Sequence, residues 1–350
     1  DEMHFLTFGE LLLRLSPGGP RSLAQALPGR LEACFGGAEA NTAVALAALG
    51  ARASFLSALP AGPLADAGLG ALAARGVDIS RVVRTGEGRL GLYYLVGGAA
   101  LRPASVLYDR AHSSFARAGE GCYPWEEVLA GGDWLHTTGI SPALGREAAA
   151  RTEEALAAAA AAGLTISVDL NYRGRLWRWS EEKPEALARR VMRPLLERAH
   201  VVVGNEEDAW RVLGLEVPGL DLARGELDPA AYADLARRTA RLLPRARHIA
   251  FSLRLSEGAS RNRWAGVLLD VAADRVHFHP AGAEGGCAPL LIDPVVDRVG
   301  GGDAFAAGLL WGLGHGRCLP AKALALAVGA GALAQTTPGD WLEVEREEVE

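Results

Sequence analysis

The chain has 350 residues, of which 49% are hydrophobic, so it is long enough to bury one large α/β core. Its net charge is −6 and its acids and bases are interspersed, which argues against nucleic acid or an anionic membrane as a partner. The four cysteines form no CxxC pair, which argues against structural zinc or a disulfide framework and favours a reducing cytoplasm.

Short apolar strands alternate with helical patterns along most of the chain, which predicts a mainly parallel sheet covered on both faces. Strands are expected at Phe5–Phe8, Ser54–Leu59, Trp134–Thr137, Thr165–Asp169, Val201–Gly204, Ile249–Leu253 and Trp264–Asp270. Helices are expected around Ala40–Leu49, Leu64–Arg75, Arg146–Ala162, Pro184–Arg198, Glu206–Leu213 and Pro229–Leu243. The apolar N-terminal stretch is interrupted by Glu10 and Arg14, so it is neither a signal-peptide core nor a membrane span.

Two stretches lack this alternation, at approximately residues 11–35 and 89–115. Tyr94 and Tyr108 belong to a pattern of extended chain in the second stretch. The two are expected to pair as a small sheet that closes over the core as a lid. The prediction for residues 1–350 is therefore one domain with a lid.

A glycine run, Gly300–Gly302, ends in Asp303 at the start of an apolar helix. Three glycines bring successive amide hydrogens toward one point, and the helix adds its positive N-terminal end. Asp303 would stand at the edge of this anion cradle and take a proton from an alcohol that attacks phosphorus. The alternative is an ordinary glycine-rich turn with Asp303 in a first helical turn.

Polar residues near other predicted strand and helix ends suggest a sugar site. Gly37 allows close approach of a ligand and Asn41 can donate and accept toward a polyol, although a plain loop and helix start fits as well. Asn171 and Arg173 follow a strand at the edge where ligands sit in open α/β sheets, and Arg173 could pair with a carboxylate. Arg110 would complete an anion clamp, unless its segment is simply an exposed strand.

A third cluster, Asn205–Asp208, also follows a strand. Its acids could hold Mg²⁺ through water while Asn205 meets a phosphate, or they could simply cap a helix. His277 and His279 alternate on one strand and are interpreted as solvated surface rather than a metal site. The two lysines follow no GxxxxG pattern, which excludes a P-loop.

Four segments together resemble the ribokinase-like (PfkB) sugar kinases, in order and spacing: GGAEAN at 36–41, DLNYR at 169–173, GNEEDA at 204–209 and DRVGGGDAFAAGL at 297–309. The resemblance covers nearly the whole chain. Within that family the chain looks most like the 2-keto-3-deoxygluconate kinases, through residues 138–144, 172–173 and 297–302.

The resemblance implies a three-layer α/β/α sandwich and a β-sheet lid that forms a homodimer contact. It implies transfer of the γ-phosphoryl group of ATP, with Mg²⁺, to the terminal hydroxyl of a sugar acid. Asp303 would be the base and the amides of Gly300, Gly301 and Gly302 would hold the phosphoryl group. By position, the sugar acid would face Gly37, Asn41, Tyr94, Tyr108, Arg110, Asn171 and Arg173. The nucleotide would face Asn205, Asp208, Ser252, Arg254 and Gly331.

The chain departs from the commoner family form DTxGAGD, because Arg298 and Gly301 replace the threonine and the alanine. Asp208 also stands where a glutamate is usual. Two other functions stay open: a kinase of the family that acts on a neutral sugar or nucleoside, and a catalytically silent sugar-binding regulator. A neutral sugar needs no clamp of two arginines, and a silent copy has no chemical reason to keep Asp303.

Overall fold

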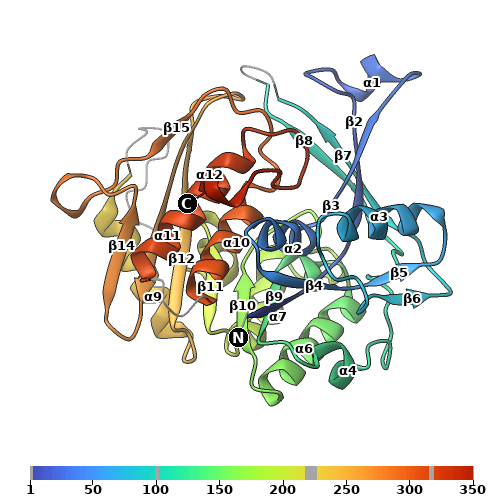
Figure 1. The fold of residues 1–350 in the computed structure, drawn as a ribbon, viewed down its shortest axis with the longest axis horizontal. Coiled ribbons are helices and arrows are strands. Elements are labelled where there is room, and N and C mark those ends of the chain that lie inside the picture. The colour runs from blue at the N-terminus through green and yellow to red at the C-terminus, as the bar shows by residue number, and fades with distance from the viewer. Residues whose placement is uncertain (1–2, 99–101, 217–226, 315–318, 350) are drawn as a thin grey trace.

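The computed structural model describes residues 3–98, 102–216, 227–314 and 319–349. Among these residues the central feature is one nine-stranded sheet (Figure 1). Its strands are β1 (His4–Phe8), β4 (Arg52–Leu56), β9 (Trp134–Thr138), β10 (Thr165–Asp169), β11 (Val201–Gly204), β12 (His248–Ser256), β13 (Asn262–Asp270), β14 (Arg275–His279) and β15 (Leu290–Ile292). The order is β14–β13–β12–β11–β10–β9–β1–β4, with β15 paired to β13. The strands from β12 to β4 run parallel, which confirms the mainly parallel sheet.

The register of the parallel strands brings their carboxyl ends to one edge. Phe5 of β1 pairs with Ala53 of β4 and with Trp134 of β9. On the other side of β9, Thr138 pairs with Asp169 at the end of β10. Ligands of open parallel sheets bind outside this edge, so the loops that follow these strands are the place to look for a site.

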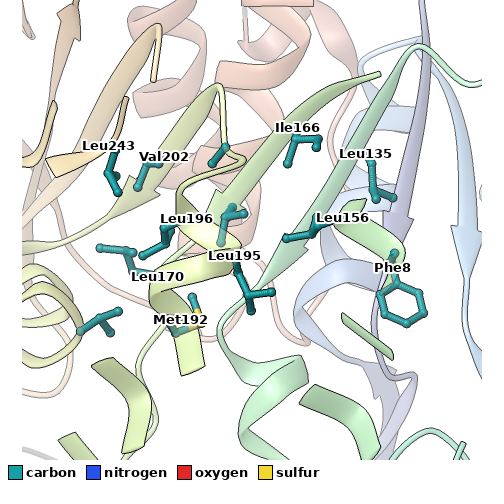
Figure 2. Close-up of a cluster of buried hydrophobic side chains, with 14 of the residues drawn as sticks. Phe8, Leu135, Leu156, Ile166, Leu170, Met192, Leu195, Leu196, Val202 and Leu243 are labelled. Atoms are coloured by element: carbon teal, nitrogen blue, oxygen red, sulfur yellow. The ribbon is translucent and has the colours of Figure 1, made fainter. Parts of the chain in front are cut away.

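One face of the sheet packs against α4 (Trp125–Leu129), α6 (Arg146–Ala161), α7 (Pro184–Leu196) and α9 (Pro229–Leu242). Figure 2 shows part of this cluster, in which Leu135, Ile166 and Val202 come from strands. Leu156 of α6 and Leu195 of α7 cover them from outside the sheet. All are buried, and burial of each such side chain contributes about 1.5–3 kcal/mol.

The opposite face packs against α2 (Ala38–Ala48), α10 (Gly301–Gly314) and α11 (Pro320–Ala334), which lie together in Figure 1. The strand residues in this second cluster are the neighbours of those in the first: Phe5, Trp134 and Val203. This period of two places alternate side chains on opposite faces, and both faces are apolar because both are covered. The fold is therefore the three-layer sandwich that the sequence predicted.

A separate small sheet projects from the core, at the upper right of Figure 1. It contains β2 (Leu12–Ser16), β3 (Glu32–Gly36), β7 (Gly91–Val96) and β8 (Ser105–Asp109), in the order β3–β2–β7–β8. The pairing of β2 with β7 is parallel and the others are antiparallel. On its inner face Leu12, Tyr93 and Leu95 are buried, whereas Leu107 on its outer face is 58% exposed. The two stretches expected to form a small sheet therefore do so.

The other elements are α1 (Leu23–Ala26), α3 (Pro63–Ala73), α5 (Ile140–Ala143), α8 (Glu206–Asp208), a π-helical turn (Ala209–Leu213), a 3₁₀ turn (Ala283–Gly285), α12 (Arg346–Val349) and a two-stranded sheet of β5 (Ala58–Pro60) and β6 (Val83–Thr85). The strand expected at Ser54–Leu59 was wrong in extent, because the chain leaves the main sheet after Leu56 and pairs β5 with β6. The described part of the chain contains no helix that is long and apolar enough to span a membrane.

Candidate active site

The candidate site lies at the edge where the parallel strands end. Two hydrogen bonds connect the helix starts to this edge. Glu39, in the first turn of α2, accepts a hydrogen bond from the backbone N–H of Thr138 at the end of β9 (3.0 Å). Asn41, on the same turn, donates from Nδ2 to Oδ2 of Asp303 in the first turn of α10 (2.7 Å). The glycine motif and the N-terminal motif are therefore parts of one site.

The turn that precedes α10 has the geometry of an anion cradle. Gly300 has a φ of +83°, and a Cβ at this position would lie 2.1 Å from the carbonyl oxygen of Asp340, so only glycine fits. Because α10 begins at Gly301, its first amides have no carbonyl partner within the helix. Gly302 is exposed and has open space at its Cβ position. An anion can therefore approach these amides.

Asp303 is 8% exposed, and one of its carboxylate oxygens accepts a hydrogen bond from Asn41. Burial raises the pKa of Asp303 to about 7, while the hydrogen bond from Asn41 and the positive charge of Arg173 oppose that rise. A carboxyl group with a pKa near neutrality suits a general base, since it is both available and able to take up a proton.

Glu39 is a buried acid that we did not single out from the sequence. Its Oε1 accepts hydrogen bonds from the Thr138 hydroxyl (2.7 Å) and the Ser141 hydroxyl (2.9 Å), in addition to the Thr138 amide. Burial raises the pKa of Glu39, and these hydrogen bonds counteract the rise. Its negative charge in turn raises the pKa of Asp303. The sequence signal that could have identified Glu39 is a single carboxylate among the small apolar residues at the start of this helix.

The last residue of β10 and the loop that follows it each carry a polar side chain at this edge. Asn171 is 7% exposed and adopts a left-handed backbone with a φ of +35°, which is unusual for a residue other than glycine. Its backbone N–H donates to Oδ1 of Asp169 (3.1 Å). Burial, together with Asp208 and Asp303 nearby, raises the pKa of Asp169 well above its usual range.

Three buried oxygens on the start of α2 and on loops that follow β1 and β10 have no hydrogen-bond partner among the described residues. These orphaned oxygens are Oδ1 of Asn41, Oδ1 of Asn171 and Oε1 of Glu10. Such groups cost about 1–3 kcal/mol each when left unpaired, so they fit a site that is completed by a ligand with several hydroxyls. Gly37, with a φ of +126°, allows the carbonyl of Glu10 to lie close beside the start of α2.

Arg173 is exposed in the same region. Its Nη1 donates to the carbonyl of Tyr172 (2.9 Å). Desolvation lowers the pKa of Arg173. The nearby Tyr108 and the acids of the site, Asp303 among them, outweigh this effect, so the pKa is raised overall. The structure thus brings Arg173 into electrostatic reach of both Tyr108 and Asp303.

Tyr94 does not join them. On β7 the side chain of Tyr93 is buried on the inner face of the small sheet and is paired across from Tyr108. Tyr94 is the next residue and pairs with the exposed Leu107, so it lies on the outer face. The sequence has two adjacent tyrosines and no signal about which of them points inward, so the sugar contact expected of Tyr94 stays a prediction.

Arg110 is buried and already paired. Its Nε and Nη2 contact Oε2 of Glu10 at 2.7 and 2.6 Å, and both side chains are nearly inaccessible to solvent. The charge of Arg110 is therefore balanced within the protein. Glu10 lies two residues after the end of β1, and this position just beyond a central strand could have identified it.

The cluster after β11 works mainly as a helix cap. Oδ1 of Asn205 accepts from the backbone N–H of Asp208, and Oδ2 of Asp208 accepts from the backbone N–H of Asn205. The other oxygen of Asp208 accepts from the amide of Tyr172 (2.9 Å). Burial raises the pKa of Asp208 to about 6, against the influence of Arg173. Asp208 thus fastens the loop after β10, and the helix-cap alternative describes its contacts.

The residues expected to face a nucleotide are only partly assembled. Ser252 is half-buried within β12, and Arg254 is exposed two residues later. Desolvation lowers the pKa of Arg254, whereas Glu206 raises it. Arg298, beside the glycine turn, binds the hydroxyl of Ser256 (3.1 Å) and the carbonyl of Gly258. Sequence comparison had marked Arg298 only as a departure from the family pattern.

Gly331 lies within α11, where it packs closely against Gly301 and Trp264. A Cβ there would lie 2.9 Å from the carbonyl oxygen of Gly301 and 2.7 Å from the Trp264 ring. Its neighbours Ala332 and Leu333 do line a cavity of about 440 Å³. The remaining lining residues are Leu290, Leu291, Ile292, Asp293, Pro294, Val296 and Thr336. This mainly apolar cavity adjoins the segment that leads into the glycine turn.

Comparison with known proteins agrees with this geometry. The profile of the pfkB family carbohydrate kinases matches residues 11–228, which is more than half of the chain. The chain belongs to this family of carbohydrate kinases. A 2-dehydro-3-deoxygalactonokinase from Haloferax volcanii is 31% identical over 99% of this chain and 95% of its own length. A fructokinase from Klebsiella pneumoniae is 30% identical over 95% and 92%.

Solved structures of pfkB-family and related kinases have the same architecture. A 2-dehydro-3-deoxygluconokinase from Thermotoga maritima is 38% identical and superposes with a TM-score of 0.89, covering 99% of this chain and 98% of its own. The two chains thus share one fold over nearly their whole lengths.

Proposed function

We propose that this carbohydrate kinase transfers the γ-phosphoryl group of ATP to the terminal hydroxyl of a 2-keto-3-deoxy sugar acid, with 2-keto-3-deoxy-D-gluconate as substrate and the 6-phosphate as product. The observation that carries the proposal is the exposed guanidinium of Arg173 within electrostatic reach of Asp303. A guanidinium binds a carboxylate through two parallel hydrogen bonds, and a neutral sugar offers no such partner.

The polyol chain of the substrate would satisfy the orphaned oxygens. Sugar hydroxyls can donate to Oδ1 of Asn41, Oδ1 of Asn171 and Oε1 of Glu10, which lie buried and unpaired in the described structure. Arg110 would then act differently from Arg173, as a buried cation that keeps Glu10 in place. Tyr108 lies on the inner face of the small sheet beside Arg173 and completes the proposed sugar site.

Asp303 would be the general base. Asn41 holds its Oδ2, so the other oxygen is the one to take the proton from the substrate hydroxyl. The amides at Gly301 and Gly302 and the N-terminal end of α10 would stabilise the negative charge on the transferring phosphoryl group. The residues thus supply orientation, proton uptake and charge stabilisation at one place.

The 440 Å³ cavity beside Val296 would hold the adenine ring, since an apolar wall suits its π-face and the cavity adjoins the glycine turn. Arg254 and Arg298 would face the phosphates. We propose that Mg²⁺ enters with ATP. Its nearest protein partner through water would be Glu206, whose Oε2 is buried without a partner among the described residues, and the ion would offset phosphate charge.

We further propose that residues 1–350 act as one cytoplasmic kinase domain, with the small sheet as its lid, and that two copies pair through the outer face of that sheet. The exposed Leu107 and its neighbour Tyr94 support this surface. Light scattering on wild type and Leu107→Arg tests it: a dimer that becomes a monomer supports the contact, and a monomeric wild type contradicts it.

The test of the substrate is ADP release with ATP and Mg²⁺ over 2-keto-3-deoxygluconate, 2-keto-3-deoxygalactonate, gluconate, fructose and ribose. We expect turnover of the keto-deoxy acids. Arg173→Met should raise the KM for the acid about tenfold or more. Arg178→Met, an exposed arginine of the same loop, should not change it. Turnover of fructose alone, as the Klebsiella pneumoniae relative would suggest, contradicts the sugar-acid proposal.

A further inference from the structure

We propose that Arg14 is a positioning residue for phosphoryl transfer: from strand β2 of the small sheet it binds Asp297 and Asp340, the two carboxylates that back the turn at Gly300. The proposal concerns a side chain that does not touch the proposed substrate or nucleotide space. Arg14 holds the two acids in place, and these in turn fix the position of the backbone amides of the turn. The proposal rests on the proposed phosphoryl transfer at Gly300–Gly302.

Arg14 makes two short, buried ion pairs. Its Nη2 lies 2.6 Å from Oδ2 of Asp297, and its Nη1 lies 2.9 Å from Oδ1 of Asp340. The side chains of all three residues are at most 9% exposed. Burial lowers the pKa of Arg14, but the two acids more than compensate and raise it, so the guanidinium stays charged. One planar cation therefore holds two separate loops.

Each acid is part of the support of the glycine turn. Oδ1 of Asp297 accepts a hydrogen bond from the amide of Val299 (3.0 Å), and its Oδ2 accepts from the amide of Gly339 (3.3 Å). The backbone of Asp340 lies directly against Gly300, where a Cβ would meet its carbonyl oxygen at 2.1 Å. A shift of either acid therefore moves the turn.

The small sheet provides a second contact to the same acid. Tyr93, which pairs across from Arg14 in the register of β2 with β7, donates its hydroxyl hydrogen to Oδ2 of Asp340 (2.5 Å). Val299 packs on the inner face of this sheet beside Tyr93. The position of the small sheet and the position of the glycine turn are thus coupled through Arg14 and Tyr93.

A guanidinium is needed here for its shape as well as its charge. Its two Nη groups reach two acids in fixed directions, whereas a lysine ammonium would be a single point of charge. With one cation for two carboxylates, removal of Arg14 leaves two buried anions facing one another, which costs stability in addition to geometry. An experiment must therefore separate the stability effect from the positioning effect.

Three variants do this, each measured for melting temperature and for kcat and KM with ATP. Arg14→Lys keeps the charge and should fold, yet kcat should fall about 10- to 100-fold because the amides are misplaced. Arg14→Met should lose both stability and kcat. The double variant Arg14→Met with Asp340→Asn removes one anion, keeps an acceptor for Tyr93, and should regain stability while kcat stays low.

Recovery of kcat together with stability in the double variant, or wild-type kcat in Arg14→Lys, would overturn the proposal and leave Arg14 a structural residue. Arg89→Met is the matched control. Arg89 is another arginine of this region, paired with the exposed Asp109, and its loss should leave kcat unchanged.

Nucleotide binding provides a readout that folding does not move. The ratio of the Kd for ATP to the Kd for ADP, measured by calorimetry, reports how well the turn holds the terminal phosphoryl group. We expect that ratio to rise in Arg14→Lys and to be unchanged in Arg89→Met. A wild type without turnover on any sugar would refute the proposed substrates, whereas an unchanged ratio in Arg14→Lys refutes the role of Arg14.

Discussion

Asn41 donates a hydrogen bond of 2.7 Å to Asp303, although 262 residues separate the two in the chain. The bond joins the first turns of α2 and α10, which lie on the same face of the main sheet. It leaves one oxygen of Asp303 for a substrate and lowers the pKa of a carboxyl group that burial would otherwise raise further. The pKa of Asp303 therefore depends in part on a residue from the other end of the chain.

The first prediction concerns the base itself. Asp303→Asn keeps the shape and the partner of the side chain but removes the ability to take a proton. We expect kcat to fall about 10²- to 10⁴-fold with little change in KM, measured as ADP release. Asp66→Asn, at an exposed acid paired with Arg84, serves as the control and should retain full activity. Wild-type kcat in Asp303→Asn would exclude this residue as the base.

The second prediction concerns the pH dependence of the reaction. Because burial raises the pKa of Asp303 to about 7, the base is protonated and inactive below that pH. We expect kcat/KM to rise with pH and to level off above about pH 7. Stopped assays at constant ionic strength from pH 5.5 to pH 9 measure the profile, and a curve that is flat across this range would contradict it.

The third prediction uses Glu39 to shift that profile. The negative charge of Glu39 raises the pKa of Asp303, so Glu39→Gln should lower it and move the rising limb of kcat/KM to lower pH. The amide oxygen of glutamine can still accept from Thr138. Removal of Arg173 should move the limb in the opposite direction, because its positive charge lowers the same pKa. If the rising limb of kcat/KM moved in the same direction in both variants, the electrostatic explanation would be refuted.

The fourth prediction links Asp303 to stability. Its pKa in the folded protein, about 7, lies above the value of about 3.9 in an unfolded chain. The folded state therefore binds the proton more tightly, and the group makes the folded protein less stable as pH rises from about 4 to about 7, by ~1.4 kcal/mol per pH unit at most. We expect Asp303→Asn to melt at a higher temperature than wild type at pH 8, with a smaller difference at pH 5. Equal differences at both pH values would contradict this.

The fifth prediction tests the cavity proposed for adenine. Val296 is 53% exposed and lines the cavity, so Val296→Asp should be tolerated by the fold while it places a charge on an apolar wall. We expect the KM for ATP to rise about tenfold, with the KM for the sugar unchanged. Leu319→Asp changes an apolar residue that is 75% exposed and is not part of the cavity, and should affect neither constant.

Periodicity identified the scaffold well because both faces of the parallel sheet are covered, so that its strands are short continuous apolar runs. The glycine turn was also readable, since its conformation at Gly300 needs glycine and its function needs free amides. The separation of Asn41 from Asp303 was bridged only by the family resemblance. No local pattern carries a contact over such a distance.

The sequence was less informative about which polar side chains are already paired with other groups of the protein. Arg110 and Asp208 were expected to face the ligands, but in the structure Arg110 is paired with Glu10 and Asp208 accepts from the backbone N–H of Tyr172. Glu39 went unnoticed because a single acid in a helix start usually faces water. Arg14 was interpreted only as an interruption of an apolar stretch, since both of its partners lie far along the chain.

The position of α10 in the order of the chain has a consequence during synthesis. A nascent chain that has left the ribosome as far as β15 already contains every strand of the main sheet, together with Asn41, Arg110 and Arg173. It lacks Asp303 and the whole of α10, which the proposed mechanism needs for proton uptake and for stabilising the phosphoryl group. On that mechanism the chain cannot consume ATP while most of its sheet is being assembled, and it gains activity only when α10 docks beside α2.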